Sequence, residues 1–340
     1  MLKPYFCYVK NATINDIARE AGVSRSLVSA VLTNIQKGRK VYRVGEATND
    51  RILAIMERLD YRPNFSARAL RMGDNRTIGV ILSDISNRFF ALVSRGIVDC
   101  AQKHGYTVIF GNTDENPDNL ARTIDLFYDK GVKGFIIVPC AGSENIILRY
   151  RDKGMAMVLL DRDFDGSLIS SVTLDNRRAS IQLTGKILEE GHRAVEFVSY
   201  AQAPNTIIDR EEGYCEEMRR YGLDSSIRIH RPEYGNASQI EKVILDAIGR
   251  GVDALVFATY RTALLGRHAT IRNNITSPCA FACFNNADTF DIYERGMYYV
   301  KQPIEDFARN SVELLIAQLS GGSPICTKTV LPPQIEKTDF

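Results

Sequence analysis

The 340-residue chain contains no tryptophan and only four histidines. The histidines stand alone, without the spacing of a Ser/His/Asp triad or of a metal site. The chain also lacks a G-x-x-x-x-G-K-[ST] phosphate loop, and no G-x-G-x-x-G follows an apolar run. These absences argue against an enzyme, so we predict no catalytic residue and no cofactor.

Long apolar runs are also missing. No stretch of 18 apolar residues occurs, which predicts a chain without a membrane span. The N-terminus lacks the apolar region and cleavage site of a secretory signal. The seven cysteines are odd in number and scattered, and Cys279 and Cys283 have no further ligand pair nearby, so no metal site is expected. These features predict a cytoplasmic protein and argue against an exported solute-binding protein.

Charge is distributed unevenly along the chain. Residues 1–72 carry 13 lysines and arginines against 6 aspartates and glutamates, a net charge of +7. The remaining residues carry 30 against 35, a net charge of −5. A basic head on an acidic body is typical of a nucleic-acid-binding domain joined to another domain.

Residues 13–32 have the pattern of two short helices around a tight turn. Apolar residues recur at helical spacing on both sides of Gly22, which suits a left-handed helix end. Ser24 can cap the second helix. This pattern predicts a helix-turn-helix, whose second helix places its first residues at base edges in the DNA major groove. Taken alone, the same pattern also fits a helical hairpin in an unrelated core.

Two further features follow in the chain. A third helix is expected at about 47–59, and Pro63 stops it. From Arg76 onward, short and almost continuous apolar runs alternate with helical stretches, which is typical of buried parallel strands in doubly wound α/β lobes.

Three motifs carry a resemblance to a known family: DIAREAGVS at Asp16–Ser24, YRPN-x-x-AR-x-L at Tyr61–Leu70 and VKQPI at Val300–Ile304. With them, the chain resembles the lactose-repressor (LacI/GalR) family of bacterial transcription regulators along essentially its whole length. The resemblance implies a multidomain fold. An all-α helix-turn-helix domain would precede a two-lobed α/β domain that is similar to periplasmic binding proteins and contains two doubly wound parallel sheets.

The resemblance also implies the domain boundaries. We expect a DNA-binding domain at 1–62, a hinge helix and linker at 63–75, and an effector-binding and dimerisation domain at 76–340. Chain crossings near 173–176, 299–303 and 325–328 would separate an N-lobe (about 76–173 and 302–326) from a C-lobe (about 174–301 and 327–340). In the family, the hinge helix wedges a leucine into the DNA minor groove, and Leu70 occupies that position.

The expected DNA-binding residues lie on the reading helix, at its borders and in the hinge. They are Thr13, Ser24, Arg25, Ser26, Ser29, Ala30, Asn34, Tyr61, Asn64, Ala67 and Leu70. Arg25 could contact guanine in a bidentate manner, whereas Ala30 could only touch a thymine methyl group. The basic loop around Gly38 is either a solvated surface loop or a phosphate-contacting loop.

A ligand site is expected at the carboxyl ends of the strands, where open α/β sheets bind ligands. The expected effector-binding residues are Asp84, Phe90, Asp161, Arg210, Tyr260, Asn285 and Gln302. Family members stack the ligand ring on an aromatic such as Phe90, although Phe89 or Phe90 could belong to the core. Arg210 could instead pair with Asp209 or Glu211.

Several positions depart from the family pattern. Arg88 replaces the proline of the N-P-F-F motif, Thr259–Tyr260 replaces Asn-Asp, and Asn285 replaces an aspartate that holds sugar hydroxyls. These changes weaken the case for a neutral sugar, and arginines near the cavity mouth would equally suit a phosphorylated or carboxylated ligand. A pocket that no longer binds a ligand is the remaining alternative.

These features together predict a sequence-specific transcription regulator, and specifically a repressor. Its partners would be a pseudo-palindromic operator in double-stranded DNA, a carbohydrate-related effector and a second copy of the chain in a homodimer. The tail TVLPPQIEKTDF has no heptad repeat, so a coiled-coil tetramer is not expected.

Overall fold

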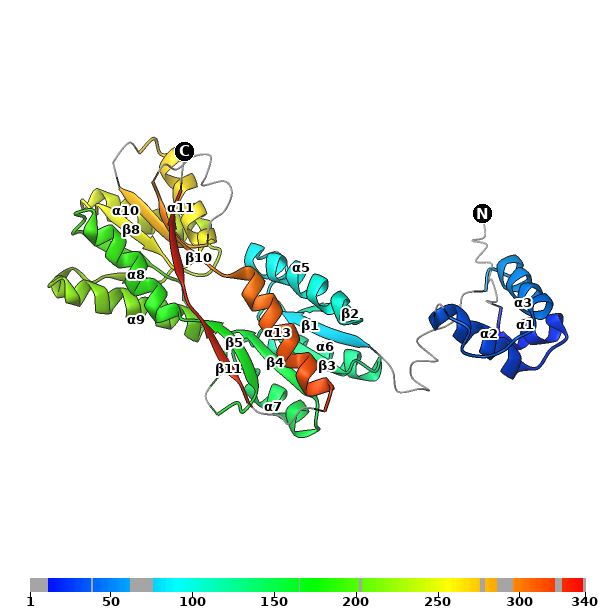
Figure 1. Ribbon diagram of the computed structural model, residues 1–340. Helices are drawn as coiled ribbons and strands as arrows, with labels where there is room; N and C mark the ends of the chain where they lie inside the picture. The colour runs from blue at the N-terminus through cyan, green and yellow to red at the C-terminus, as the bar shows by residue number, and fades with distance from the viewer. Residues whose placement is uncertain are drawn as a thin grey trace. The chain divides into compact units, whose positions relative to one another are not determined.

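The computed structural model describes residues 12–37, 39–61, 76–164, 166–201, 204–275, 279–285, 296–321 and 326–338. Its internal contacts divide the chain into two units, Met1–Asn75 and Arg76–Phe340 (Figure 1). The first unit is helical, and the second unit contains two sheets with their helices.

Within its described residues, the first unit contains three helices: α1 (Ile14–Ala21), α2 (Arg25–Lys37) and α3 (Glu46–Arg58). Their apolar faces share one small core that includes Ile17, Val28 and Ile52, which are fully buried. Helix α2 continues past residue 32, where the sequence pattern placed its end. In this extension the Thr33 hydroxyl donates a hydrogen bond to the Ser29 carbonyl (2.8 Å), so the polar side chain is satisfied within the helix.

The first lobe of the second unit is built on a six-stranded parallel sheet in the order β11-β5-β4-β3-β1-β2. Its strands are β1 (Thr77–Leu82), β2 (Thr107–Asn112), β3 (Gly134–Ile137), β4 (Ala156–Asp161), β5 (Ser170–Leu174) and β11 (Lys328–Leu331). Its helices are α5 (Arg88–Lys103), α6 (Pro117–Asp129), α7 (Glu144–Asp152) and α13 (Ile304–Leu319). Figure 1 shows α13, in orange, running along this sheet beside α5.

The second lobe repeats the design with the sheet order β12-β10-β9-β8-β6-β7. Its strands are β6 (Val195–Val198), β7 (Ile229–His230), β8 (Ala254–Phe257), β9 (Ala280–Phe284), β10 (Tyr298–Lys301) and β12 (Gln334–Lys337). The helices of this lobe that the structure describes are α8 (Asn176–Glu189), α9 (Asn205–Arg220), α10 (Ala237–Gly249) and α11 (Tyr260–Arg272), with a short 3-10 turn η1 (Asp224–Ser226). All pairs are parallel except β12 with β10. The predicted fold class, a helical head followed by two doubly wound α/β lobes, is confirmed.

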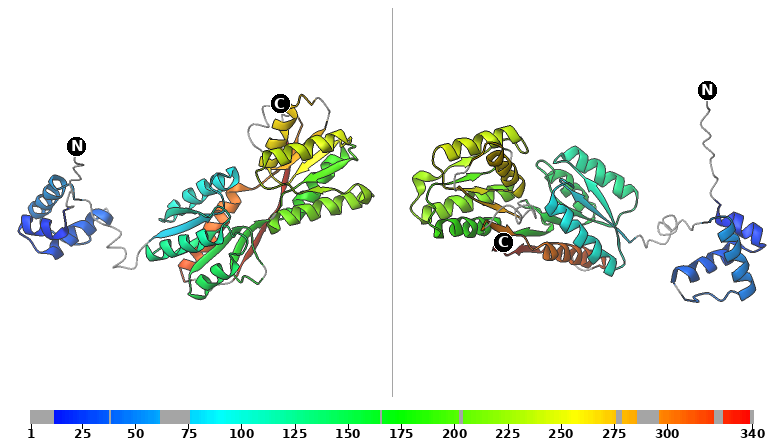
Figure 2. Two further views of the ribbon diagram at one scale, coloured as in Figure 1. Left: turned by 180° about the vertical axis from the view of Figure 1, so that it is seen from behind. Right: turned by 90° about the horizontal axis from the view of Figure 1, so that it is seen from above.

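The chain passes three times between the lobes, which lie side by side in both views of Figure 2. It crosses at Asp175, between β5 and α8, and at 302–303, between β10 and α13. The third crossing was expected near 325–328, and this expectation is wrong. Strand β11 still belongs to the first sheet and β12 to the second, so the crossing lies at Pro332–Pro333. Residues 328–331 therefore belong to the first lobe.

Buried strands determine where a site can form. In β1, β3, β4, β6, β8 and β9 almost every residue is buried, because helices cover both faces of each sheet. Polar side chains are therefore few in the interiors of these strands, where Glu196 of β6 is an exception, and they gather just beyond the carboxyl ends, where the chain turns toward the next helix.

Candidate functional site

The turn between α1 and α2 is held by side-chain caps. Thr13 Oγ1 accepts a hydrogen bond from Asp16 N (3.3 Å), and Asp16 Oδ2 accepts one from Thr13 N (3.0 Å), which forms a reciprocal capping box. Gly22 ends α1 with a left-handed φ of 62°. Ser24 Oγ then accepts a hydrogen bond from Leu27 N (3.3 Å) at the start of α2. Thr13 and Ser24 thus act as helix caps.

The first residues of α2 are open to solvent. Ser24, Arg25 and Ser26 are exposed, and Ser29 and Ala30 are half-buried. The first turn of α2 contains no acidic residue, and Arg25 forms no ion pair with any residue that the structure describes. The Arg25 guanidinium therefore keeps its donors free for an acceptor outside the protein.

Asn34 has a different environment from the other expected DNA-binding residues. Its Nδ2 donates to the Tyr42 carbonyl (2.8 Å), and its Oδ1 accepts from the Val41 and Tyr42 amides (2.8 and 2.9 Å). The amide group is thus engaged with the backbone of the loop that follows α2. This contact fixes the loop that carries the exposed Arg39 and Arg43.

Four expected DNA-binding residues lie at or beyond the end of α3. Tyr61 is half-buried against the core of the first unit, and its amide donates to the Met56 carbonyl (2.8 Å). Asn64, Ala67 and Leu70 lie outside the described residues.

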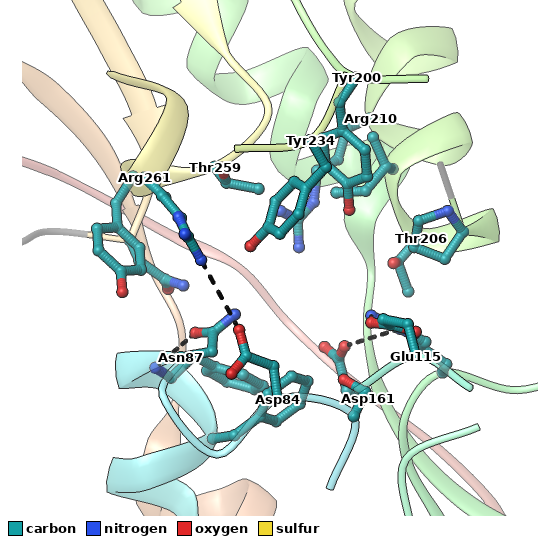
Figure 3. Close-up of a pocket in the computed structure, with 18 of the residues that line it drawn as sticks. Asp84, Asn87, Glu115, Asp161, Tyr200, Thr206, Arg210, Tyr234, Thr259 and Arg261 are labelled. Carbon is teal, nitrogen blue, oxygen red and sulfur yellow. Dashed lines mark hydrogen bonds and ion pairs between the residues drawn. The ribbon is translucent and has the colours of Figure 1, made fainter. Parts of the chain in front are cut away.

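A cavity of about 500 Å³ lies between the two lobes of the second unit. Figure 3 shows labelled side chains of the first lobe, such as Asp84 and Asp161, facing Arg210, Tyr234 and Arg261 of the second lobe. The cavity brings together all the expected effector-binding residues. These are Asp84, Phe90, Asp161, Arg210, Tyr260, Asn285 and Gln302.

Two of these residues occupy equivalent positions in the two lobes. Asp161 ends β4 and Asn285 follows β9, the corresponding strand of the second sheet. Both adopt left-handed backbone conformations, with φ of 66° and 65°. Aspartate and asparagine tolerate this conformation better than other side-chain-bearing residues. The turn at the end of each strand thus presents an acceptor side chain to the cavity.

Asp161 and Arg210 form the electrostatic centre of the cavity. Burial raises the pKa of Asp161, and the charges of Arg162 and Arg210 oppose this shift. Burial also lowers the pKa of Arg210 to about 10, which leaves its guanidinium protonated at neutral pH. Arg162 Nε lies 3.8 Å from Asp161 Oδ2, while the two terminal nitrogens of Arg162 pair with Glu115 at 2.7 Å each.

Arg210 is held by the second lobe and does not pair with its sequence neighbours. Its Nε donates to Asn176 Oδ1 (2.8 Å) and its Nη1 donates to the Ala258 carbonyl (2.7 Å). The guanidinium lies 3.9 Å from the centre of the Phe284 ring. Its Nη2 forms no hydrogen bond within the described part of the chain, so both N–H groups of this nitrogen remain for a ligand. Glu211 pairs instead with Arg231.

Gln302 and the paired phenylalanines complete the cavity wall. Gln302 is only 6% exposed, and its Oε1 has no hydrogen-bond partner among the described residues. Phe89 and Phe90 are both buried and both line the cavity. Phe89 packs edge-on against Phe307 of α13 (5.3 Å between centroids), so it belongs to the core as well.

The structure adds lining residues that the sequence pattern missed, notably Glu115 and Tyr234. Glu115 lies three residues beyond the end of β2, and Tyr234 follows β7, which has only two residues and no apolar run. Glu115 would have been predicted if the residues up to three positions beyond each strand had been included. No local signal marks Tyr234.

In the part of the chain that the structure describes, no cluster of three or more His, Cys, Asp or Glu side chains could hold a metal ion. No described helix is both long and apolar enough to span a bilayer.

Comparison with known proteins agrees with this geometry. Residues 13–64 match the model of the lacI family of bacterial regulatory proteins, residues 75–240 match the periplasmic binding proteins and sugar binding domain of the LacI family, and residues 184–337 match a periplasmic binding protein-like domain. Catabolite control protein A of Priestia megaterium is 28% identical over 332 residues, which cover 96% of this chain and 98% of that protein.

Two solved structures show the same fold. A lac repressor dimer bound to operator and the anti-inducer ONPF has a TM-score of 0.80 at 18% identity, over 97% of this chain and 99% of that chain. The Cra dual regulator of Pseudomonas putida in complex with fructose 1-phosphate has a TM-score of 0.70 at 21% identity, over 78% of this chain and all of that chain.

Proposed function

We propose a function that proceeds from one premise: the chain belongs to the LacI family of bacterial transcription regulators, which bind DNA. Beyond this premise, we propose that it is a cytoplasmic repressor that binds a pseudo-palindromic operator as a homodimer. A small ligand between the lobes would control operator affinity. The ligand would be a sugar or a sugar derivative.

The first unit supports sequence reading. Helix α2 presents Arg25 and Ser26 at its exposed start, while Thr13, Ser24 and Asn34 fix the elements around it. Arginine is suited to bidentate contact with the guanine edge in the major groove. We assign base reading to Arg25 and Ser26, and a positioning role to Asn34.

One observation carries the ligand proposal: the cavity holds buried polar groups that the described protein leaves unsatisfied. Gln302 Oε1 is buried without a hydrogen-bond partner there. At the cavity, Arg210 Nη2 forms no hydrogen bond with the described residues, and the Asp161 carboxylate has only a long ion pair, with Arg162 Nε at 3.8 Å from Asp161 Oδ2. An unsatisfied buried polar group costs about 1–3 kcal/mol. A ligand rich in hydroxyl groups could donate to Asp161 and Gln302 and accept from Arg210, which would recover this cost.

The charged side chains that line the cavity indicate which class of ligand it could bind. Four carboxylates and three arginines line it: Asp84, Asp114, Glu115, Asp161, Arg162, Arg210 and Arg261. Glu115 neutralises Arg162, so the cations that could meet a phosphorylated ligand are Arg210 and Arg261, the latter with a longer contact to Asp84 (3.9 Å). The similar Cra structure contains fructose 1-phosphate, and a sugar phosphate is therefore included with neutral sugars in the proposed class.

Ligand binding would act on DNA through the lobes. Asp161 belongs to the first lobe and Arg210 to the second, so a ligand that contacts both would favour one interlobe angle. That angle would set the spacing of the two hinge segments in a dimer, and thereby operator affinity. Linkage requires operator and ligand to change each other's affinity by the same factor.

Two alternatives follow from specific features. A regulator with a degenerate pocket would fit the departures at Thr259, Tyr260 and Asn285, but it would leave the unsatisfied polar groups without a purpose. A solute-binding protein would need no helical head like the one that α1, α2 and α3 form.

A two-step experiment tests the proposal. The full-length chain is used to select duplexes from a randomised library, and affinity for the enriched duplex is then measured by titration at fixed salt. The titration is repeated with a panel of neutral sugars and sugar phosphates. We expect two inverted half-sites and a ligand that lowers operator affinity at least fivefold. An enriched sequence without inverted symmetry would refute the dimeric reader, and an affinity unchanged by the whole panel would favour the degenerate pocket.

A further inference from the structure

A hydrogen bond joins the two lobes at the cavity mouth. The Arg88 amide donates to the hydroxyl oxygen of Tyr260 at 3.3 Å. Arg88 is the first residue of α5 in the first lobe, and Tyr260 is the first residue of α11 in the second. The bond therefore exists only while the lobes are close together.

The contact satisfies a group that its own helix leaves open. The first amides of a helix have no intrahelical acceptor. At the start of α5, Asn87 Oδ1 accepts from the Phe89 amide (3.0 Å), and the Arg88 amide goes to Tyr260 instead. Opening of the lobes would break this bond and return the Arg88 amide to solvent.

Both partners are departures from the family pattern, and the departures are complementary. A proline at position 88 would have no N–H to donate, and the aspartate that usually stands at position 260 has a much shorter side chain than tyrosine. Arg88 supplies the amide donor, and the tyrosine side chain at position 260 is long enough to bring its hydroxyl oxygen to that amide. Neither change alone would create the bond.

A second contact lies beside the first. Arg261 Nη1 is 3.9 Å from Asp84 Oδ2, and Figure 3 shows this pair spanning the cavity. The Arg261 guanidinium also lies 5.3 Å from the centre of the Tyr234 ring. Both members of the ion pair are partly exposed, so it adds little free energy but restrains the same two segments.

We propose that Arg88 and Tyr260 form an interlobe latch that holds the lobes closed over the cavity when no ligand is bound. The Tyr260 hydroxyl then closes the lobes and is not a ligand contact, although its ring still lines the cavity. The latch itself does not depend on the proposed function, whereas its effect on regulation does.

Three substitutions separate the latch from other roles of these residues. Tyr260→Phe removes one oxygen and keeps the ring. Arg88→Pro removes the amide hydrogen, and proline is favoured at the first position of a helix. Asn87 already has the extended conformation (φ −71°, ψ 119°) that precedes proline. Arg88→Ala is the matched control, because it removes the same side chain and keeps the amide.

The interlobe distance is measured in the ligand-free, DNA-free full chain. Nitroxide labels are attached through a bioorthogonal amino acid at the exposed Asp129 of α6 and the exposed Lys242 of α10, so the native cysteines stay in place. Pulsed dipolar spectroscopy then gives the distribution of distances. Loss of one hydrogen bond corresponds to about a fivefold rise in the ratio of open to closed molecules.

We expect Tyr260→Phe to shift the distribution about fivefold toward open relative to wild type, and Arg88→Pro to shift it by the same factor relative to Arg88→Ala. The double variant should shift it no further than either single variant, because both remove the same bond. A Tyr260→Phe distribution equal to wild type would overturn the latch, as would an additive double variant. If Arg88→Pro fails to fold, Tyr260→Phe alone decides. Since the samples contain neither DNA nor ligand, the outcome is independent of the proposed function.

Discussion

Replacement of Asn34 by alanine tests whether this residue reads DNA or positions a loop. The substitution removes three hydrogen bonds of 2.8, 2.8 and 2.9 Å to the backbone at Val41 and Tyr42. We expect the loop after α2 to open more often, and affinity for all duplexes to fall by a similar factor, because Arg39 and Arg43 lose their fixed position.

The magnitude follows from the number and exposure of these bonds. A neutral hydrogen bond contributes about 0.5–1.5 kcal/mol net. Val41 and Tyr42 are 43% and 52% exposed, so the freed backbone groups can bond to water and the lower half of this range applies. Three bonds then amount to about 2 kcal/mol, which corresponds to roughly a 30-fold rise in the population of the open loop.

Hydrogen exchange of the Val41 and Tyr42 amides in the full chain measures this opening directly. Asn34→Asp is the control for the exchange measurement, because it keeps the Oδ1 acceptor of both amides and loses only the donor to the Tyr42 carbonyl. We expect about 30-fold faster exchange in Asn34→Ala and much smaller acceleration in Asn34→Asp.

Titration of DNA binding can refute the positioning role of Asn34. Binding of Asn34→Ala is titrated against the selected operator and against single-base variants of it at one salt concentration. If discrimination at one base pair collapses while Val41 and Tyr42 remain protected, Asn34 contacts a base and the positioning role is wrong.

Three further substitutions test other parts of the proposal. Arg25→Ala should reduce discrimination at one base pair of each half-site by about 1–3 kcal/mol in competitive titration, whereas uniform weakening would make Arg25 a phosphate contact. Leu70→Ala should reduce operator bending and affinity in gel-shift assays without changing the melting temperature of the body, and unchanged bending would contradict the hinge interpretation. Burial raises the pKa of Asp161, so this group favours folding at low pH and that contribution is lost as pH rises through its folded pKa. Asp161→Asn should therefore gain stability relative to wild type as pH rises in thermal unfolding, while ligand response is lost; a constant difference would show that the carboxylate is not destabilised by burial.

The sequence predicted the fold well where strands are buried on both faces. Such strands read as continuous apolar runs, and their alternation with helices leaves few topologies. The third lobe crossing was misplaced because β11 and β12 have four residues each and no apolar run. Their sheet membership is decided by pairing with β5 and β10, which lie far away in the sequence.

The positions of the cavity residues followed from one geometric rule, since polar residues just beyond buried strands must meet at one edge, and from family positions such as Phe90 in the N-P-F-F motif and Gln302 in VKQPI. Their roles remain predictions. The hydrogen bonds of the Asn34 side chain could not be predicted from the sequence, because its partners are backbone groups of a loop seven and eight residues away. The hydrogen bond between Arg88 and Tyr260 could not be predicted either. In the sequence, each residue only replaces a family residue, and the structure is needed to show that the two lie within hydrogen-bond distance.

The interlobe latch limits how strongly a ligand can regulate this protein. A ligand shifts an equilibrium only by its differential affinity for the two states, and a latch that already favours closure leaves less of that equilibrium to shift. Breaking the latch with Arg88→Pro should therefore widen the ligand-dependent change in operator affinity by up to about fivefold relative to Arg88→Ala, a factor that matches one hydrogen bond. Arg88 does not line the cavity, so the intrinsic affinity of the closed lobes for the ligand should be the same in both variants. An equal ligand response in Arg88→Pro and Arg88→Ala, together with the expected shift in interlobe distance, would show that lobe closure is not the coordinate that controls DNA binding.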